Sequence, residues 1–217
     1  MSKPSQTEAV YFAKDYYPPE LALTAEVELE FLVSKLVGII NLLDATDLSA
    51  EDIPMVKRGV SLFDARIIPK SSQIMFGVAT EVLNGQWVVG KAYRTTNLET
   101  ILTHVAACNL VGELAIGEDT LHFPRTLGAG GTYFQRGRSS KRISFLIQEQ
   151  VAESTKKPSA TLISTLITTL AKAGFSVDKN PRNWFYDPVR KHIYYVDLIL
   201  TTKGVEGEVR RLLSLIR

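Results

Sequence analysis

Residues 177–197 read VDKNPRNWFYDPVRKHIYYVD, and this stretch predicts a β-hairpin flanked by polar side chains. Two aromatic-rich apolar runs, Trp184–Tyr186 and Ile193–Val196, have the length and composition of short strands. The polar segment between them begins with Asp187-Pro188, a pair that favours a turn. The two runs are therefore expected to pair as the antiparallel strands of one hairpin.

Polar residues stand at both ends of this predicted hairpin. Asn183 precedes the first run, Asp197 follows the second, and Asp178 lies five positions before Asn183. Since a hairpin returns the chain to the end where it began, we expect these three side chains to converge. Carboxylate and amide oxygens suit Mg²⁺, which usually takes one or two protein ligands together with phosphate oxygens. The stretch therefore predicts phosphate chemistry.

Regular elements are predicted upstream and downstream of the hairpin. Apolar residues at three- and four-residue spacing predict a helix that begins near Ser159 and ends at Gly174, a typical C-cap residue. The same spacing recurs over residues 97–114 and over the C-terminal segment 205–216. These three segments are expected to be helices with one buried face.

Alternating patterns predict further strands before residue 150. Residues 74–83 and 86–93 are strand-like runs joined by Asn84-Gly85, the strongest short hairpin signal because both residues tolerate positive φ. The glycine-rich segment 128–131 separates the predicted helix over residues 97–114 from a predicted strand over Ile143–Ile147. Four basic residues before this strand predict a solvated hairpin tip, with an anionic-ligand site as the alternative: Arg136, Arg138, Lys141 and Arg142.

The N-terminal part of the chain divides in two. Residues 1–19 are polar and aromatic by turns and end in Pro18-Pro19, which is typical of a mobile arm or a docking segment. From Glu20 to Leu43 apolar residues recur at helical spacing, which predicts a long first helix. Together with the hairpins, these helices predict an α+β fold.

Composition excludes several classes of function. The 217 residues carry 25 Lys+Arg and 23 Asp+Glu, and a net charge of +2 provides no broad positive field, so no nucleic-acid partner is expected. The single Cys108 excludes an intramolecular disulfide, and no signal peptide is evident. The longest apolar run, Leu36–Leu43, is too short to span a membrane. We expect a cytoplasmic protein, with a secreted effector as the alternative.

The ordered set of elements resembles the protein-kinase family over residues 65–200. Asp178 and Asn183 have the spacing of the kinase catalytic loop H-R-D-x-x-x-x-N, and Asp197 stands at the position of the D-F-G aspartate. Val88-Val89-Gly90-Lys91 looks like the V-A-I-K strand, and the helix after it looks like the αC helix. Phe145–Val151 looks like the fifth strand running into the hinge.

This resemblance implies a protein-kinase-like fold of reduced size, similar to minimal bacterial kinases. It implies a small antiparallel-sheet N-lobe over residues 61–151, followed by a reduced, mostly helical C-lobe over 152–217 that contains the catalytic-loop-like hairpin. Residues 1–60 would form an additional arm and amphipathic helix.

The resemblance also implies roles for individual residues. Asp178 would accept or orient the acceptor proton, Asn183 and Asp197 would hold Mg²⁺, and Lys91 would contact the α- and β-phosphates of ATP. Lys91 would pair with Glu113, or alternatively with Glu99.

Glu149 and Val151 would present hinge backbone groups to the adenine. The implied activity is an ATP- and Mg²⁺-dependent phosphotransferase that acts on a protein.

The sequence is also compatible with two other functions. A pseudokinase that binds or scaffolds a protein is favoured by Ser176 and Val177, which replace the His and Arg of H-R-D, and by a loop at 68–73 without glycine. Only 20 residues follow Asp197, so we do not expect an activation segment. A metal-dependent nuclease would instead gather Asp187, Asp197 and Lys203 at a sheet edge.

Overall fold

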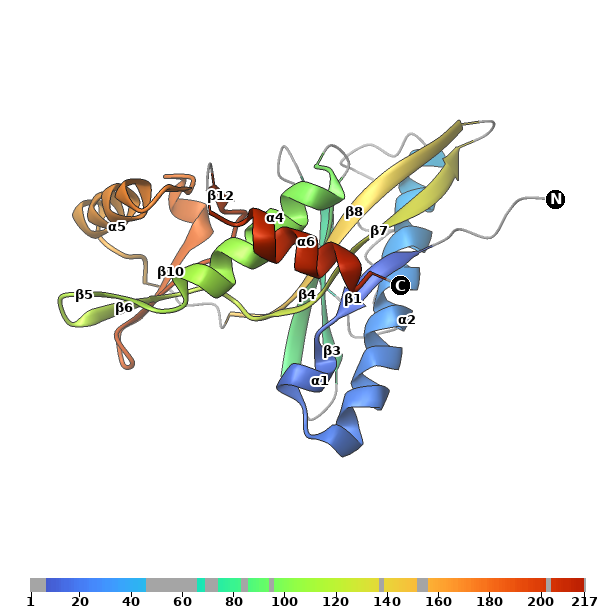
Figure 1. The fold of residues 1–217 in the computed structure, drawn as a ribbon, viewed down its shortest axis with the longest axis horizontal. Helices are drawn as coiled ribbons and strands as arrows, with labels where there is room; N and C mark the ends of the chain where they lie inside the picture. Colours follow the sequence, from blue (N-terminus) through green and yellow to red (C-terminus); the bar gives the residue numbers. More distant parts are fainter. Residues whose placement is uncertain are drawn as a thin grey trace. The chain divides into compact units, whose positions relative to one another are not determined.

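The computed structural model describes residues 7–45, 66–68, 74–82, 86–93, 96–136, 139–151, 156–201 and 204–216, which form an α+β fold (Figure 1). The first elements are β1 (Glu8–Tyr11), α1 (Ala13–Tyr16), α2 (Pro19–Ala45), β2 (Arg66–Ile68), β3 (Ile74–Val82), β4 (Gln86–Tyr93) and α4 (Leu98–Val111). They are followed by β5 (Leu114–Ile116), β6 (Asp119–His122), β7 (Thr126–Arg136), β8 (Ser139–Glu149) and α5 (Ala160–Lys172). The last are β9 (Phe175–Ser176), η2 (Pro181–Asn183), β10 (Trp184–Asp187), β11 (His192–Tyr195), β12 (Leu200–Thr201) and α6 (Glu206–Ser214).

The chain folds into two compact units, and each unit is made of segments that are separated in the sequence. The first unit comprises Met1–Ile101, Thr126–Gln150 and Ile216–Arg217, and the second comprises Leu102–Arg125 and Val151–Leu215. The chain thus leaves the first unit within α4, returns to it with β7 and leaves it again after β8.

A six-stranded antiparallel sheet forms the centre of the first unit. Its strand order is β1-β7-β8-β4-β3-β2. Val82 pairs with Gln86, which confirms the predicted β3–β4 hairpin, although its Asn84-Gly85 turn lies outside the described residues. β7 and β8 pair up to Arg136 and Ser139, which confirms a hairpin tip at the basic segment.

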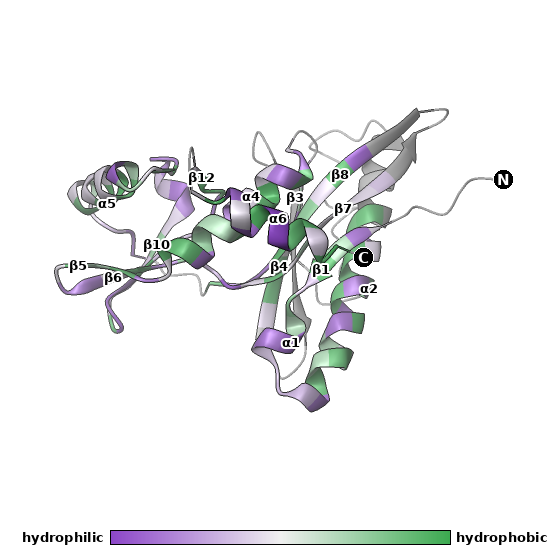
Figure 2. Ribbon diagram, viewed as in Figure 1, coloured by the Kyte–Doolittle hydropathy of each residue, from purple (hydrophilic) through white to green (hydrophobic). Residues whose placement is uncertain are grey.

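The predicted long helix is α2, and it packs on one face of this sheet. Leu29, Leu32, Val33 and Leu36 are buried in one cluster with residues of β4 and β8, among them Phe145. Burying a side chain of this size stabilises the fold by about 1.5–3 kcal/mol. Figure 2 shows how hydrophobic and hydrophilic residues alternate along α2.

The prediction of a mobile arm over residues 1–19 is wrong for residues 7–19. β1 pairs with β7 at the edge of the sheet, while Ala13 and Tyr17 are buried against the core and α2 begins at Pro19. The reason is that Ala9 and Val10 supply apolar surface to a strand whose partner lies more than 100 residues away. Residues 1–6 lie outside the described part of the chain.

The glycine-rich segment 128–131 does not interrupt regular structure, because it lies inside β7. A Cβ atom on Gly130 would lie 2.3 Å from the backbone oxygen of Glu8 and 2.8 Å from the Cα of Ala9. Glycine at this position therefore lets β1 approach β7 closely enough to pair.

The second unit contains a four-stranded sheet, the two-stranded sheet of β9 and β12, the helices α5 and α6, and most of α4. The sheet order is β10-β11-β6-β5, and β11 runs parallel to β6. Its core includes Trp184 and Tyr195, which are completely buried and whose ring centroids lie 4.8 Å apart. The predicted β10–β11 hairpin is confirmed by the pairing of Trp184 with Tyr195 and of Asp187 with His192.

Local sequence signals fix the ends of the helices. Ser159 Oγ accepts a hydrogen bond from Leu162 N at 3.2 Å at the start of α5, and Gly174 follows the helix with φ +88°. The predicted helix over 97–114 is too long at its C-terminal end: α4 ends at Val111, because Gly112 has a φ of +57° and the chain then turns into β5. The C-terminal helix is confirmed as α6.

Candidate functional site

Asp178, Asn183 and Asp197 are brought together in the second unit, as the hairpin predicts. Asn183 Nδ2 donates hydrogen bonds to Asp178 Oδ2 at 3.3 Å and to Asp197 Oδ2 at 2.9 Å. The amide therefore bridges the two carboxylates. Asp178 is exposed and Asp197 is half-buried, so solvent reaches this cluster from the side of Asp178.

The hairpin positions Asn183 and Asp197. The backbone N–H of Val196 donates to the carbonyl oxygen of Asn183 at 3.0 Å, which continues the β10–β11 pairing by one step. Asp197 is the next residue and comes to lie beside Asn183. β9 and β12 also pair, and they join the segment before Asp178 to the segment after Asp197.

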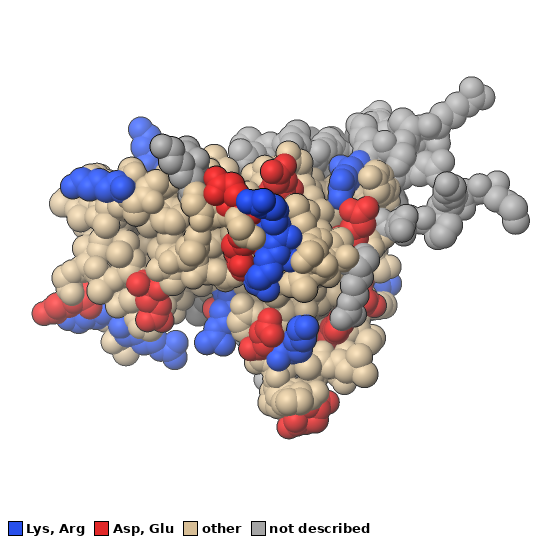
Figure 3. Space-filling view, in the orientation of Figure 1, with Lys and Arg blue, Asp and Glu red and all other residues tan. Residues whose placement is uncertain are grey.

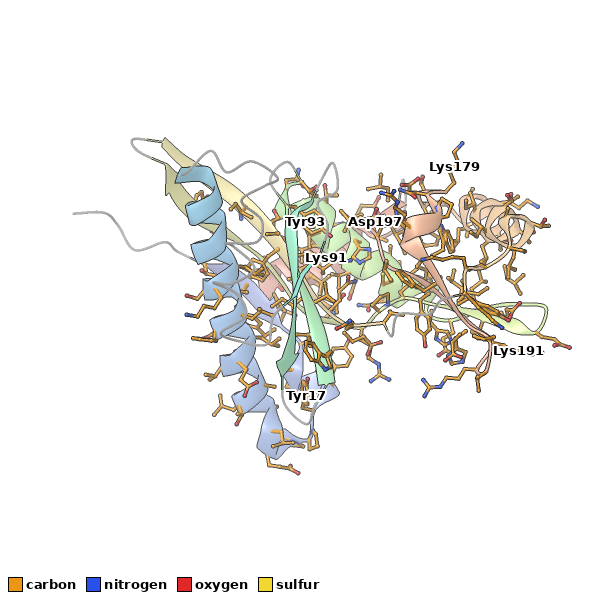
Figure 4. All side chains as sticks on the ribbon, turned by 180° about the vertical axis from the view of Figure 1, so that it is seen from behind. Tyr17, Lys91, Tyr93, Lys179, Lys191 and Asp197 are labelled. Carbon is orange, nitrogen blue, oxygen red and sulfur yellow. The ribbon has the colours of Figure 1, made fainter. Side chains whose placement is uncertain are left out.

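A chain of local hydrogen bonds shapes the loop from Asp178 to Asn183. The backbone N–H of Asn180 donates to Asp178 Oδ1 at 3.0 Å, and that of Arg182 donates to Asn180 Oδ1 at 3.1 Å. The N–H of Asn183 donates to the carbonyl of Asn180 at 3.0 Å, which closes the short helix η2. Asp and Asn are the side chains that make such turns locally. Lys179 projects outward from this loop (Figure 4).

Tyr195 ties both aspartate segments to the core. Its hydroxyl accepts a hydrogen bond from the backbone N–H of Asp178 at 2.9 Å and donates one to the carbonyl of Leu198 at 3.2 Å. Burial raises the pKa of this hydroxyl well above its usual range. On the other side of the loop, Trp184 Nε1 donates to the carbonyl of Asp178 at 3.0 Å.

The side chains of this cluster are of the types that can bind a magnesium ion. Two carboxylates and one amide supply oxygen ligands of the hard type that Mg²⁺ takes when phosphate oxygens or waters complete its shell. Asn183 presents Nδ2 to both carboxylates here, and the amide would have to turn over to offer Oδ1 to a cation. Among the described residues, no group of three or more His, Cys, Asp or Glu side chains could hold a metal ion.

His104 is a residue of this region that the sequence did not single out. It lies on α4 with 1% of its surface exposed, and its Nδ1 accepts a hydrogen bond from the backbone N–H of Ile199 at 3.0 Å. Cys108 Sγ lies 3.7 Å from the ring. The one available signal is that a histidine lies among the apolar residues of a predicted helix, between Ile101 and Val105.

Lys91 belongs to the first unit and is buried in β4, with 8% of its surface exposed. Among the Asp, Glu, Lys and Arg residues whose burial the structure describes, Lys91 is the one that is buried. In β4, Val88 and Ala92 belong to the core under α2, and the close approach of Leu36 to Gly90 places this glycine on the same face. Because side chains alternate along a strand, Lys91 lies on the opposite face of the sheet.

Other buried polar residues share that opposite face. Tyr93 follows two positions after Lys91 and pairs with Ser144, while Gln148 of β8 pairs with Val89. Ser144 and Gln148 are each 2% exposed, and Tyr93 is completely buried. Figure 4 shows Lys91 and Tyr93 on β4. The sheet thus has one apolar face against α2 and one face that carries buried polar groups.

The structure also describes the glutamates predicted to pair with Lys91 and the residues predicted to contact the adenine. Glu113 lies just after α4, with its side chain 72% exposed and its Oε1 3.3 Å from His122 Nδ1, and Glu99 lies exposed in the first turn of α4. Glu149 ends β8 opposite Val88, and the half-buried Val151 follows two residues later. The pairing of Lys91 with either glutamate and the adenine contacts stay predictions.

Asp187 and Asp197 of the alternative nuclease site lie at opposite ends of the β10–β11 hairpin. Asp187 Oδ1 accepts hydrogen bonds from the backbone N–H groups of Val189 and Arg190, at the turn of the hairpin, whereas Asp197 lies beyond its open end. Lys203 lies outside the described part of the chain. Basic and acidic side chains are intermixed on the surface that Figure 3 shows.

No protein-family model matches this chain, and no curated protein matches it significantly. None of the helices in the described ranges is long and apolar enough to cross a membrane.

Proposed function

We propose that this protein is an ATP- and Mg²⁺-dependent phosphotransferase of minimal kinase-like fold that acts on a protein. The observation that carries the proposal is the Asn183 amide between the carboxylates of Asp178 and Asp197. Their spacing matches the kinase catalytic loop and D-F-G aspartate, and the hairpin brings them to one place.

Phosphoryl transfer requires little covalent chemistry from the protein itself. In the proposed reaction the oxygen of an acceptor hydroxyl forms a bond to the γ-phosphorus of ATP, the bond from that phosphorus to the β,γ-bridging oxygen breaks, and ADP leaves with the bonding electron pair. Asp178, which is exposed and hydrogen-bonded to its own loop, would accept the hydroxyl proton. Bound Mg²⁺ would neutralise phosphate charge, with Asp197 and Asn183 as its protein ligands.

The first unit supports the same proposal. A lysine ammonium is costly to bury, so a buried lysine in the middle of a strand is a candidate functional residue. Lys91 is such a residue, and it shares its sheet face with Tyr93, Ser144 and Gln148. In the proposed function Lys91 would contact the α- and β-phosphates.

A pseudokinase is the second candidate, and two observations favour it. Ser176 and Val177 replace the His and Arg of H-R-D, and Asn183 bridges the carboxylates through its NH₂ group instead of presenting its oxygen. In this case the same fold would bind a protein partner without transferring phosphate.

A thermal-shift titration of the full chain with ATP, with and without Mg²⁺, tests the proposal. Ligand at 100 times its Kd stabilises the native state by about 2.7 kcal/mol, which is enough to raise Tm by several degrees. We expect a rise in Tm that requires Mg²⁺ and is lost in Asp197→Asn. Asp187→Asn is the matched control, because Asp187 lies at the other end of the hairpin.

Turnover then separates the enzyme from the pseudokinase. We expect Asp178→Asn to abolish ATP consumption while it leaves the Mg²⁺-dependent rise in Tm in place. Nucleotide binding without turnover in the wild type would favour the pseudokinase. No shift at millimolar Mg²⁺-ATP would contradict a nucleotide site altogether.

A further inference from the structure

The first three backbone polar groups after Asp197 are all hydrogen-bonded. The backbone N–H of Leu198 donates to Asp197 Oδ1 at 2.9 Å, and the carbonyl of Leu198 accepts from the Tyr195 hydroxyl at 3.2 Å. The next N–H, that of Ile199, donates to His104 Nδ1 at 3.0 Å. The Asp197 carboxylate is therefore bonded to the backbone of Leu198, and the segment 198–199 is itself held by Tyr195 and His104.

The His104 contact differs from the other two because it comes from a distant element. His104 lies 95 positions before Ile199, on α4, and both residues are buried. A buried backbone N–H needs an acceptor, and here β12 begins only at Leu200, so a side chain serves this donor. The imidazole thus fixes the segment 197–199 against α4.

We propose that His104 is a positioning residue, which holds the Asp197–Ile199 segment in the conformation that binds the divalent cation. This role rests on the proposed Mg²⁺-dependent function. His104 acts through the backbone of Ile199 and does not itself bind the cation or the nucleotide. Loss of the Nδ1 acceptor would release the Ile199 N–H and let the Asp197 carboxylate sample other directions.

Two variants separate the hydrogen bond from simple packing. In His104→Asn the Oδ1 atom stands about where Nδ1 stood, so the acceptor is kept in a smaller side chain. In His104→Leu the volume is similar and the acceptor is lost. Val105→Ala is the matched control, because Val105 is 2% exposed on the same helix and its truncation removes packing without touching the bond to Ile199.

The first readout is amide hydrogen exchange over residues 197–200, which needs no nucleotide. We expect exchange at Ile199 to be roughly tenfold or more faster in His104→Leu, as the loss of one hydrogen bond predicts, and to stay slow in His104→Asn. Val105→Ala should leave this amide as protected as in the wild type, relative to the other buried amides of the second unit.

The second readout is the Mg²⁺ concentration that half-saturates the ATP-dependent rise in Tm. We expect it to increase about tenfold in His104→Leu, while His104→Asn and Val105→Ala stay within about twofold of the wild type. If the wild type responds to Mg²⁺-ATP and His104→Leu responds equally, the positioning role is overturned and the proposed function stands. A wild type without any response overturns the proposed function, and the positioning role falls with it.

Discussion

The hydroxyl of Tyr195 accepts a hydrogen bond from the backbone N–H of Asp178 at 2.9 Å, across a separation of 17 positions in the chain. The same hydroxyl donates to the carbonyl of Leu198, one residue after Asp197. A single buried oxygen atom thus connects the two aspartate segments of the candidate site. Because the tyrosine ring also packs on Trp184, the site is attached to the core of the second unit.

Replacing Tyr195 by Phe should destabilise the protein while the ring packing persists. The change leaves a backbone N–H and a carbonyl without their partner, at a cost of about 1–3 kcal/mol. Urea denaturation at pH 7 would measure this loss. Tyr186→Phe is a suitable comparison, because that hydroxyl bonds the carboxylate of Asp119 at a partly exposed position. Equal stability of Tyr195→Phe and wild type would contradict the structural role of the hydroxyl.

The buried Tyr195 and the partly buried Tyr11 also predict a loss of stability in alkali. Burial, reinforced by nearby carboxylates, raises the folded-state pKa of Tyr195 and Tyr11 above the value of about 10 for an unfolded tyrosine. The unfolded chain therefore loses these protons first, and stability is complete below pH 10 but falls as the pH rises above it. Each tyrosine contributes up to about 1.4 kcal/mol per pH unit. Urea denaturation at pH 8, 10 and 11 should show a smaller decrease in Tyr195→Phe, and an identical decrease would contradict the assignment.

Asn183→Asp should be destabilising in the absence of divalent cations. It removes both hydrogen bonds that the amide donates and places a third carboxylate between Asp178 and Asp197, at a cost of about 1–3 kcal/mol. Under the proposed function, millimolar Mg²⁺ should restore part of this loss. Denaturation curves with Mg²⁺ and with EDTA would measure both effects.

Asn180→Asp is the matched control for this variant. It adds the same charge to the same loop, but its carboxylate can still accept the hydrogen bond from Arg182 N. We expect it to cost less than Asn183→Asp and to respond little to Mg²⁺. An equal loss in both variants would show that general charge repulsion, and not the bridging amide, is responsible.

Elements with strong local signals could be predicted from the sequence. α5 has an apolar periodicity, a Ser159 cap and a Gly174 stop, and the structure confirms all three. The approach of Asn183 to Asp197 followed from hairpin geometry alone, since a turn between two short strands must return the chain to its start.

Long-range pairings could not be predicted in this way. β1 has only four residues, and its partner in β7 lies more than 100 positions later, so no local pattern specifies their pairing. The same holds for the parallel pairing of β6 with β11 and for the hydrogen bond from Ile199 to His104. Both join residues that are far apart in the sequence and meet only when the chain packs. The amide orientation of Asn183 is set by the two carboxylates beside it, which a spacing motif does not encode.

Gly130→Ala should weaken the attachment of β1. The new Cβ would lie 2.3 Å from Glu8 O and 2.6 Å from Phe145 Cζ, and the backbone oxygen cannot move away without breaking the β1–β7 ladder. We expect a loss of about 1–3 kcal/mol and faster proteolysis within residues 7–12. Gly131→Ala is the control, because its Cβ would meet only the flexible side chain of Arg142, at 3.0 Å. Similar behaviour of the two variants would contradict the close approach at Gly130.

Lys91→Met separates a functional role of this lysine from a structural one. Lys91 is only 8% exposed in β4, and an unbranched apolar side chain of similar length can occupy the same buried position, so we expect Tm to stay within a few degrees of the wild type. Under the proposed function, loss of the charge that contacts the phosphates should lower turnover about 10²–10³-fold. Thermal denaturation and ATP consumption would be measured on the same preparation.

Lys172→Met provides the comparison, because Lys172 is exposed in the last turn of α5. We expect that variant to keep both stability and activity. A fall in the Tm of Lys91→Met by more than about 10 °C would correspond to several kcal/mol in a chain of this size and would mark Lys91 as structural. Unchanged turnover in a stable Lys91→Met would instead remove Lys91 from the site, because a buried charge that contacts the phosphates cannot be lost without affecting the reaction.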